Sequence, residues 1–473
     1  MGGAAHKIMK RAKGAVNRML HKDTIENIFH ICVKTSPDML DAISLWGAMY
    51  RDQSPWLNDE VLSLGLPSAI SAEIAQMVTL ELSVTIQGGE RGKIIERAMA
   101  DVVDKMRELV EYAAAVGTII IKPYVSNGVI GMDYVRADQF LITDYTTNGE
   151  ITGAVFSEMK THNGYQYTRF DYRCVTDKGL EIQNVVYRKR IGALGGYGVP
   201  AELTEISEWA QLPPKVILQG VDSLLIGVLR PPQANNIDMD SPLGISGFAR
   251  ATTLIKEADK QFSRLLWEFE SGERALYVSP VAFTVDPETK ERTIPNKRLY
   301  RQLKVTKDAE MGAFFEDWTP DIREQSILNG LNDILGRVED ACSLARGTIS
   351  TSHIAALKSE VTATQVKVSK QRTFATVSGW QKSVRAALTD VIDAIYVWLG
   401  VAGVSSPSNY EVVFDFDDSV ISDRDSQFAQ YMQLLTAQII TAEEMRAWYF
   451  DIPLEQAAKE LADLKPSKLF EDE

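Results

Sequence analysis

The segment from residue 241 to residue 399 most constrains the fold, because long helical stretches there flank one compact insert. The first helical stretch carries an apolar stripe whose gaps alternate between three and four residues, as on one face of an α-helix. The stripe consists of Phe248, Ala251, Ile255, Ala258, Phe262, Leu265 and Phe269. At 1.5 Å per residue, this predicted helix is roughly 35 Å long.

A second helix is predicted after Thr319, which suits an N-cap, with Pro320 at the first helical position. Its apolar stripe has the same spacing and runs through Leu328, Leu331, Leu335, Val338, Cys342 and Ala345. Between the two helices, residues 275–318 contain a β-like run and a turn at Asp286-Pro287-Glu288. This insert also holds a basic cluster of Arg298, Arg301, Lys304 and Lys307. The pattern predicts a small insert carried on two helical legs.

A polar loop and a very long helix are predicted next. The loop begins with Gly347-Thr348-Ile349-Ser350-Thr351-Ser352-His353, and its Ser and Thr side chains compete for backbone hydrogen bonds. We therefore expect it to be mobile. Apolar positions recur at helical spacing from residue 362 to residue 399, and Gly400 follows as a C-terminal cap. A continuous helix over this range is about 57 Å long.

The flanking segments differ in kind. After a basic N-terminal arm, the chain is predicted to be helical to about residue 115. Four turn signals then follow at residues 127–128, 148–149, 163–164 and 178–179, each ending in glycine and flanked by β-formers. They predict an antiparallel sheet with strands at 118–125, 129–135, 151–159, 165–175 and 180–190. A last strand is expected at 410–416 and helices at 423–464.

Composition limits the class of protein. The chain has 473 residues, 45% of them hydrophobic and 24% charged, as in a soluble globular protein of about three domains. No membrane span or signal peptide is predicted, because the apolar runs are too short. Cys32, Cys174 and Cys342 are widely spaced, so neither a disulfide framework nor a zinc ribbon is expected and a reducing cytosol is indicated.

The net charge of −14 is unevenly distributed. Residues 1–22 carry six Lys or Arg and no acid, whereas residues 411–473 carry fifteen acids against five bases. The basic arm is either a solvated terminus or a segment that orders on a partner or on nucleic acid. The acidic end is interpreted as a solvated helical face.

Motifs for catalysis are almost absent. The Gly88-Gly89-Glu90-Arg91-Gly92-Lys93 run lacks the first glycine and the final hydroxyl of a phosphate-binding loop. The five histidines are scattered, so no metal site and no cofactor are predicted. Asp415, Asp417 and Asp418 at a strand end could hold a divalent cation for nuclease-type chemistry. This remains the enzymatic alternative.

Three diffuse signatures carry a resemblance to a known family. They are the Met39–Trp46 segment with Tyr50 after it, the Asp240–Gly244 lead into the first long helix, and Val361–Val366 at the start of the longest one. Together with the order of the helices, they resemble the portal proteins of tailed double-stranded-DNA bacteriophages, of the siphophage type. The similarity covers nearly the whole chain.

The resemblance implies an α+β fold with the architecture of a phage portal. Residues 1–22 are the basic arm and residues 23–240 a wing of helices followed by an antiparallel β meander. Residues 241–274 and 319–346 form a two-helix stem, and residues 275–318 a small α/β clip. Residues 347–361 form a tunnel loop, residues 362–420 a long helix that crosses the wing and a returning wing strand, and residues 421–473 a short, acidic helical crown.

The resemblance also implies a function and partners. Such proteins form rings, usually dodecamers, at one capsid vertex, through which the terminase packages viral DNA and DNA later exits. The implied partners are the terminase, a head–tail adaptor, the major capsid and scaffolding proteins, and DNA in the channel. The expected location is the virion, after assembly in the host bacterial cytoplasm, without a membrane. A helical scaffold or capsid-binding protein without a channel is the second alternative.

Two sets of site residues are expected on this basis. The clip residues Arg298, Arg301, Lys304 and Lys307 are expected to dock the terminase and then the adaptor. The tunnel-loop residues expected nearest DNA are Ser350, Thr351, Ser352, His353 and Lys358. An acidic chain suits a channel, because a surface that neutralises many phosphates holds DNA tightly.

Overall fold

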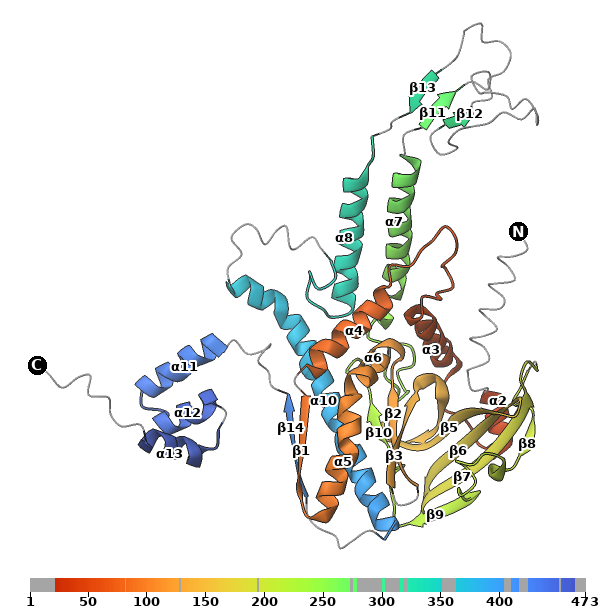
Figure 1. Ribbon diagram of the computed structural model, residues 1–473, viewed down its shortest axis with the longest axis vertical. Helices are drawn as coiled ribbons and strands as arrows, with labels where there is room; N and C mark the ends of the chain where they lie inside the picture. Colours follow the sequence, from red (N-terminus) through yellow and green to blue (C-terminus); the bar gives the residue numbers. More distant parts are fainter. Residues whose placement is uncertain are drawn as a thin grey trace, which may run out of the picture. The chain divides into compact units, whose positions relative to one another are not determined.

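The computed structural model describes most of the chain as helices and strands (Figure 1). The described residues are 22–80, 82–126, 129–193, 195–272, 275–278, 300–302, 315–318, 321–350, 363–403, 410–416, 424–450 and 452–463. The chain forms two compact units. The first comprises Met1–Thr79 and Val84–Val413, and the second comprises Leu80–Ser83 and Phe414–Glu473. The α+β class predicted from the sequence is confirmed.

The N-terminal part of the first unit is helical. Its helices are α2 (Lys22–Phe29), α3 (Pro37–Tyr50), α4 (Leu66–Thr79), α5 (Glu90–Asp104) and α6 (Met106–Val116). Ser36 caps α3 by accepting a hydrogen bond from the Met39 amide at 3.3 Å. The predicted helical region is interrupted by a strand, β1 (Leu82–Gly88), which pairs with β14 (Tyr410–Phe416). Strand β14 has the bounds that the sequence predicts.

The predicted meander is confirmed, but its strands belong to two sheets. One sheet has the order β10-β2-β3, with β2 (Ile119–Ser126), β3 (Val129–Arg136) and β10 (Gly227–Leu229). The other has the order β4-β5-β6-β7-β8, and β9 also pairs with β7. Its strands are β4 (Phe140–Tyr145), β5 (Ile151–His162), β6 (Tyr165–Thr176), β7 (Gly179–Arg190), β8 (Val199–Ala201) and β9 (Lys215–Gln219). We call these two sheets the wing sheets.

Turn chemistry explains the long β5–β6 hairpin. Asn163 and Gly164 both have positive φ, 48° and 77°, which is the backbone of a two-residue turn that Asn-Gly adopts at little cost. The register is unbroken from His162 paired with Tyr165 to Gly153 paired with Cys174. The hydrophobic core on this sheet includes Ile25, Val33, Leu141, Val155 and Phe170.

The longest helix is α10 (Ala363–Val401), close to the predicted range. It contacts β10, β2, α4 and α5, so it runs through the middle of the first unit (Figure 1). Its predicted apolar stripe is buried at Val377, Trp380, Val384, Leu388, Val391, Ile395 and Leu399. Gly227 of β10 allows this packing, since a Cβ there would lie 2.4 Å from Val391 Cγ2 and 2.5 Å from the Ala387 carbonyl oxygen.

The predicted pair of long helices is present as α7 (Thr252–Ser271) and α8 (Glu324–Ala341), which lie side by side (Figure 1). We call them the stem helices. A short 3-10 turn, Ala249–Ala251, precedes α7. Between them, β11 (Ala275–Val278) pairs parallel with β12 (Tyr300–Gln302) and antiparallel with β13 (Phe315–Trp318). The predicted insert therefore contains a three-stranded sheet.

The predicted start of the second stem helix was wrong. Thr319 and Pro320 lie outside the described residues, and α8 begins only at Glu324. The reason is a contact with α7. The Arg323 backbone amide donates to Glu268 Oε1 at 3.1 Å, which holds the chain in a non-helical entry before the first turn.

The second unit contains the helices predicted for the C-terminal region. They are α11 (Arg424–Thr436), α12 (Ala442–Phe450) and α13 (Leu454–Asp463). Tyr431 stacks on Trp448 with ring centroids 4.1 Å apart, and Thr441 and Glu444 form a capping pair at the start of α12. Within the described residues, no helix has both the length and the apolar character that crossing a membrane requires.

Candidate functional site at the stem and the loop root

The two stem helices pack through their apolar stripes. Ile255, Ala258 and Leu265 of α7 are buried, and so are Leu331, Leu335 and Val338 of α8. Burying such a seam provides most of the favourable free energy of a helix pair. The stripe does not extend along all of α7, however. Near its C-terminal end, Trp267 and Phe269 are 62% and 46% exposed.

An ion pair closes the stem where the chain leaves for the insert. The Arg323 guanidinium donates from Nε to Glu268 Oε1 at 3.1 Å and from Nη2 to Oε2 at 2.9 Å. The hydrogen bonds from Arg323 hold the pKa of Glu268 below its ordinary value. This two-point contact fixes the entry of α8 against the end of α7.

At the opposite end of α8, the chain reverses onto α10. Ser343 has a positive φ of 58°, and its carbonyl oxygen accepts a hydrogen bond from Thr376 Oγ1 at 2.8 Å. The Ala345 amide donates to Thr373 Oγ1 at 2.7 Å. Two threonines of α10 therefore hold the turn that follows α8.

Asp340 joins the same three segments electrostatically. Its carboxylate pairs with Arg346 at 2.6 Å and also with Arg372 of α10. The hydrogen bond from Arg346 is the largest influence that holds the pKa of Asp340 below its ordinary value, and Arg372 adds to it. Both arginines are about half exposed, so solvent screens these pairs.

Glu339 makes the densest set of contacts in this region. Its side chain is fully buried, and its Oε1 accepts hydrogen bonds from the amides of Ile349 at 2.5 Å and Ser350 at 2.8 Å. The Gly347 amide lies 3.2 Å from both oxygens, and Ser350 Oγ donates to Oε2 at 2.9 Å. Gly347 has a φ of 91°, which glycine adopts without strain and which sets the direction of the residues that follow it. We call residues 347–350 the loop root.

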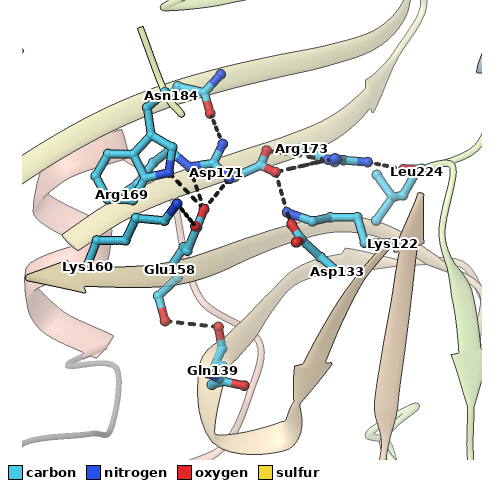
Figure 2. A network of polar contacts seen from close by, with 12 residues as sticks. Lys122, Asp133, Gln139, Glu158, Lys160, Arg169, Asp171, Arg173, Asn184 and Leu224 are labelled. Carbon is cyan, nitrogen blue, oxygen red and sulfur yellow. Dashed lines mark hydrogen bonds and ion pairs between the residues drawn. The ribbon is translucent and has the colours of Figure 1, made fainter. Parts of the chain in front are cut away.

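A second polar cluster lies between the two wing sheets (Figure 2). Lys122 of β2 and Arg173 of β6 both converge on Asp171, at 2.8 and 3.3 Å. Arg173 also donates to the Leu224 carbonyl oxygen at 3.0 Å. Burial alone would raise the pKa of the Asp171 carboxyl, but Arg173, Lys122 and Arg169 outweigh it and hold that pKa far below its ordinary value.

The polar groups around Arg169, next to Asp171, also have hydrogen-bond partners. Arg169 donates to Glu158 at 2.8 Å and to Asn184 at 2.9 Å, and Trp209 Nε1 donates to Glu158 at 3.0 Å. Because these buried charges are paired and hydrogen-bonded, the cluster fastens one sheet to the other. Its location between the sheets indicates a structural role.

The structure describes only two of the predicted site residues. Ser350 is 3% exposed, so its side chain contacts Glu339 rather than solvent, and the loop root is held where a mobile loop was expected. Thr351, Ser352, His353 and Lys358 lie outside the described residues. Arg301 lies in β12, opposite Tyr277 of β11. Arg298, Lys304 and Lys307 are outside the described part of the chain.

The enzymatic alternative gains no support. Asp415 lies in β14, and Asp417 and Asp418 fall outside the described residues. Among the residues that are described, no three His, Cys, Asp or Glu side chains gather in a way that could hold a metal ion.

Sequence reasoning missed Glu339, although a signal was present. Leu331, Leu335 and Glu339 are spaced by four residues, so a carboxylate stands in an otherwise apolar row of the helix. Asp259 of α7 is a similar case, in a row with Ile255 and Ser263. It accepts hydrogen bonds from Trp56 Nε1 and from the Leu64 amide, both at 2.9 Å. A charged residue in an apolar row indicates a buried, satisfied polar contact.

A mixed wing, a two-helix stem with a strand insert, and a long helix that returns through the wing together form a portal-like fold. The sequence model of the family described as "Phage portal protein, SPP1 Gp6-like" matches residues 95–466 of this chain. The chain therefore belongs to this phage portal protein family, which supports a role in connecting head and tail in a phage particle.

One similar solved chain comes from the "Neck of native GTA particle computed with C12 symmetry". It shares 10% sequence identity and a TM-score of 0.41 with this protein, and the match covers 87% of this chain and 94% of that chain. No curated protein matches the sequence.

Proposed function

We propose that this protein forms a ring at one vertex of the capsid, through which a terminase packages double-stranded DNA and through which DNA later exits. The single observation that carries the proposal is the paired stem of α7 and α8 in a chain of the portal family. The stem bears an insert between its helices and leads, through the loop root, into α10. A rigid channel wall requires this kind of long, packed element.

The surface of the stem supports ring formation. Leu266, Trp267 and Phe269 are exposed near the end of α7, and Ile322 is exposed before α8. Trp267 and Phe269 are two positions apart on a helix, so they face different sides of it, and large exposed aromatic side chains indicate surfaces that another protein covers. In a head-to-tail ring every subunit has a neighbour on each side, so both exposed sides of the stem are covered.

The two ends of the stem have separate proposed tasks. Residues 275–318 form the clip, and Arg298, Arg301, Lys304 and Lys307 dock the terminase during packaging and the head–tail adaptor afterwards. Residues 347–361 form the tunnel loop, and Ser350, Thr351, Ser352, His353 and Lys358 belong to the part of the chain nearest DNA. Because Ser350 is buried in the loop root, it acts there as an anchor, and the residues after it are left to approach DNA.

The remaining parts of the proposal follow from the same role. The ring is a dodecamer that the major capsid and scaffolding proteins incorporate during assembly in the host cytoplasm, and it remains in the virion. No catalytic step is assigned to the chain. Its net charge of −14 suits a channel, since an acidic wall repels phosphates and lets DNA slide.

Native mass spectrometry of the purified full chain tests ring formation. We expect one closed oligomer of about twelve copies and little monomer, as for a closed cyclic assembly. Trp267→Asp places a charge on an exposed side of the stem and should shift the population toward monomer. The matched control is Val129→Asp, because Val129 is 68% exposed on β3, away from the stem. Monomer or dimer for the unmodified chain at micromolar concentration would contradict the proposal.

A further inference from the structure

Glu339 differs from its acidic neighbours on α8 in what it contacts. Asp333 and Asp340, on the same helix, pair with arginines at the surface. Glu339 is fully buried, and the hydrogen bonds that it accepts from described residues come from neutral donors: the amides of Gly347, Ile349 and Ser350, and the Ser350 hydroxyl.

This arrangement is costly unless it is complete. Moving a carboxylate from water into a protein interior is unfavourable, and several hydrogen bonds must replace its hydration. Here three backbone amides and one hydroxyl converge on two oxygens, and all the donors come from four consecutive residues. A charged acceptor makes each of these bonds stronger than a bond between neutral groups. The carboxylate therefore organises the backbone of the loop root around itself.

The loop root is also where three elements meet. Glu339 belongs to the last turn of α8, and the chain between it and the root is held to α10 through Ser343 and Ala345. Thr348 is bound to the Ala345 carbonyl oxygen through its amide and its hydroxyl, and the amides of Gly347, Ile349 and Ser350 are bound to α8 through Glu339. Glu339 is thus the α8 side chain that most directly positions the segment that leaves the stem.

We propose that Glu339 is the positioning residue of the tunnel loop: its buried carboxylate fixes Gly347–Ser350 to stem helix α8 and so sets where the DNA-facing segment begins. The inference rests on the proposed function for its consequence in the ring. Its structural part, the hold of Glu339 on the loop root, does not depend on ring formation.

The variant Glu339→Gln tests the inference, because it keeps the shape of the side chain and removes its charge. One terminal oxygen becomes an amino group that faces backbone donors instead of accepting from them. We expect amide hydrogen exchange at Gly347, Ile349 and Ser350 to become about tenfold faster or more, with exchange in the middle of α8 unchanged.

Two further variants make the test specific. Ser350→Ala removes one donor to Glu339 and the hydroxyl that accepts from the Gly347 amide at 3.3 Å, but it keeps the carboxylate, so its exchange should lie between wild type and Glu339→Gln. Asp333→Asn is the matched control, since it neutralises a carboxylate of α8 that is exposed and paired only with Arg337 in the described structure. In phage carrying each variant, rings should form, and the length or retention of packaged DNA should fall in the order Asp333→Asn, Ser350→Ala, Glu339→Gln.

Each result has a definite meaning. Unchanged exchange of the loop-root amides in Glu339→Gln would overturn the inference. Faster exchange with DNA packaging and retention equal to those of Asp333→Asn would overturn it too, because the hold would then be structural only. If Glu339→Gln does not assemble, amide exchange and DNA packaging of Ser350→Ala test the inference in its place. A wild-type chain that forms no ring would refute the proposed function instead. The exchange data would still test whether Glu339 holds the loop root.

Discussion

At the scale of single residues, Asp171 shows how the wing sheets are held together. Its carboxylate lies between Lys122 of one sheet and Arg173 of the other. Since the folded pKa is lowered, the stabilisation is complete above the ordinary value of 3.8 and is lost as the pH falls below it. At neutral pH the full contribution is present.

Replacing Asp171 by Asn should destabilise the wing strongly. The change leaves Lys122 and Arg173 buried without their counter-charge, which costs about 3–5 kcal/mol of unfolding free energy for a broken buried pair. Urea unfolding of the full chain at pH 7 measures the loss. The difference from wild type should shrink as the pH is lowered below 3.8, because Asp171 then takes up a proton in the unfolded wild-type chain while it stays ionised in the folded one.

Asp133→Asn is the matched control for this prediction. Asp133 also contacts Lys122, at 3.4 Å, but its side chain is 36% exposed. Its removal should cost at most about 1 kcal/mol, as for a partly solvated pair. An equal loss for the two variants would show that burial of Asp171 is not what matters.

The sequence carries part of this residue-scale information. Arg169, Asp171 and Arg173 alternate along a strand, so they share one face, and their signs also alternate. The partner Lys122 could not be predicted, because it comes from another sheet and no short-range pattern links the two strands. The row of Leu331, Leu335 and Glu339 indicates a buried carboxylate, but it does not show that Ser350 is one of the donors that the carboxylate meets.

At the scale of elements, local signals determined what could be predicted. The turn signals ending in glycine located β5, β6 and β7, and the apolar stripes located both stem helices and α10. The short strand β10 and the strand β1, which pairs only with β14 in the described structure, were missed. Each is defined by a partner far away in the sequence, so its own residues carry a weak signal.

Two glycine substitutions test the packing of elements, because one is expected to lower the free energy of unfolding and the other to raise it. Gly227→Ala puts a methyl group 2.4 Å from Val391 and should destabilise the first unit by about 1–3 kcal/mol, because β10 and α10 are forced apart. Gly330 lies in α8, and a Cβ there would lie 3.4 Å from the flexible Gln261 amide nitrogen. Gly330→Ala should therefore stabilise the protein by up to about 1 kcal/mol, because alanine favours a helix more than glycine does.

Thermal unfolding of both glycine variants beside wild type provides the comparison. If Gly227→Ala leaves the melting temperature unchanged or raises it, then the close approach of β10 to α10 is not as described.

At the scale of the whole molecule, the proposed partners of the clip can be tested by charge. Replacing Arg298, Arg301, Lys304 and Lys307 together by Glu should preserve the ring, since the stem is unchanged. Binding of the terminase and of the adaptor should weaken, and the remaining binding should depend less on salt concentration, because attractive charge pairs are lost.

The matched control replaces four basic residues of the wing by Glu, namely Lys178, Lys189, Arg190 and Lys215. This variant should still bind both the terminase and the adaptor. The measurement is affinity at two salt concentrations. Unchanged affinity of both partners for the clip variant would refute the assignment.

The family and the α+β fold could be predicted from the sequence at this scale, and the match over residues 95–466 confirms the family. A ring is a property of many copies, whereas the sequence and the structure each describe one. The exposed Trp267 and Phe269 are the described features that point beyond a single chain.

Electron microscopy of the purified full-length protein tests the central claim most directly. The account predicts class averages of a closed ring with an open central hole wide enough for double-stranded DNA. Particles without a hole, or only monomers at concentrations where the protein is folded, would contradict it.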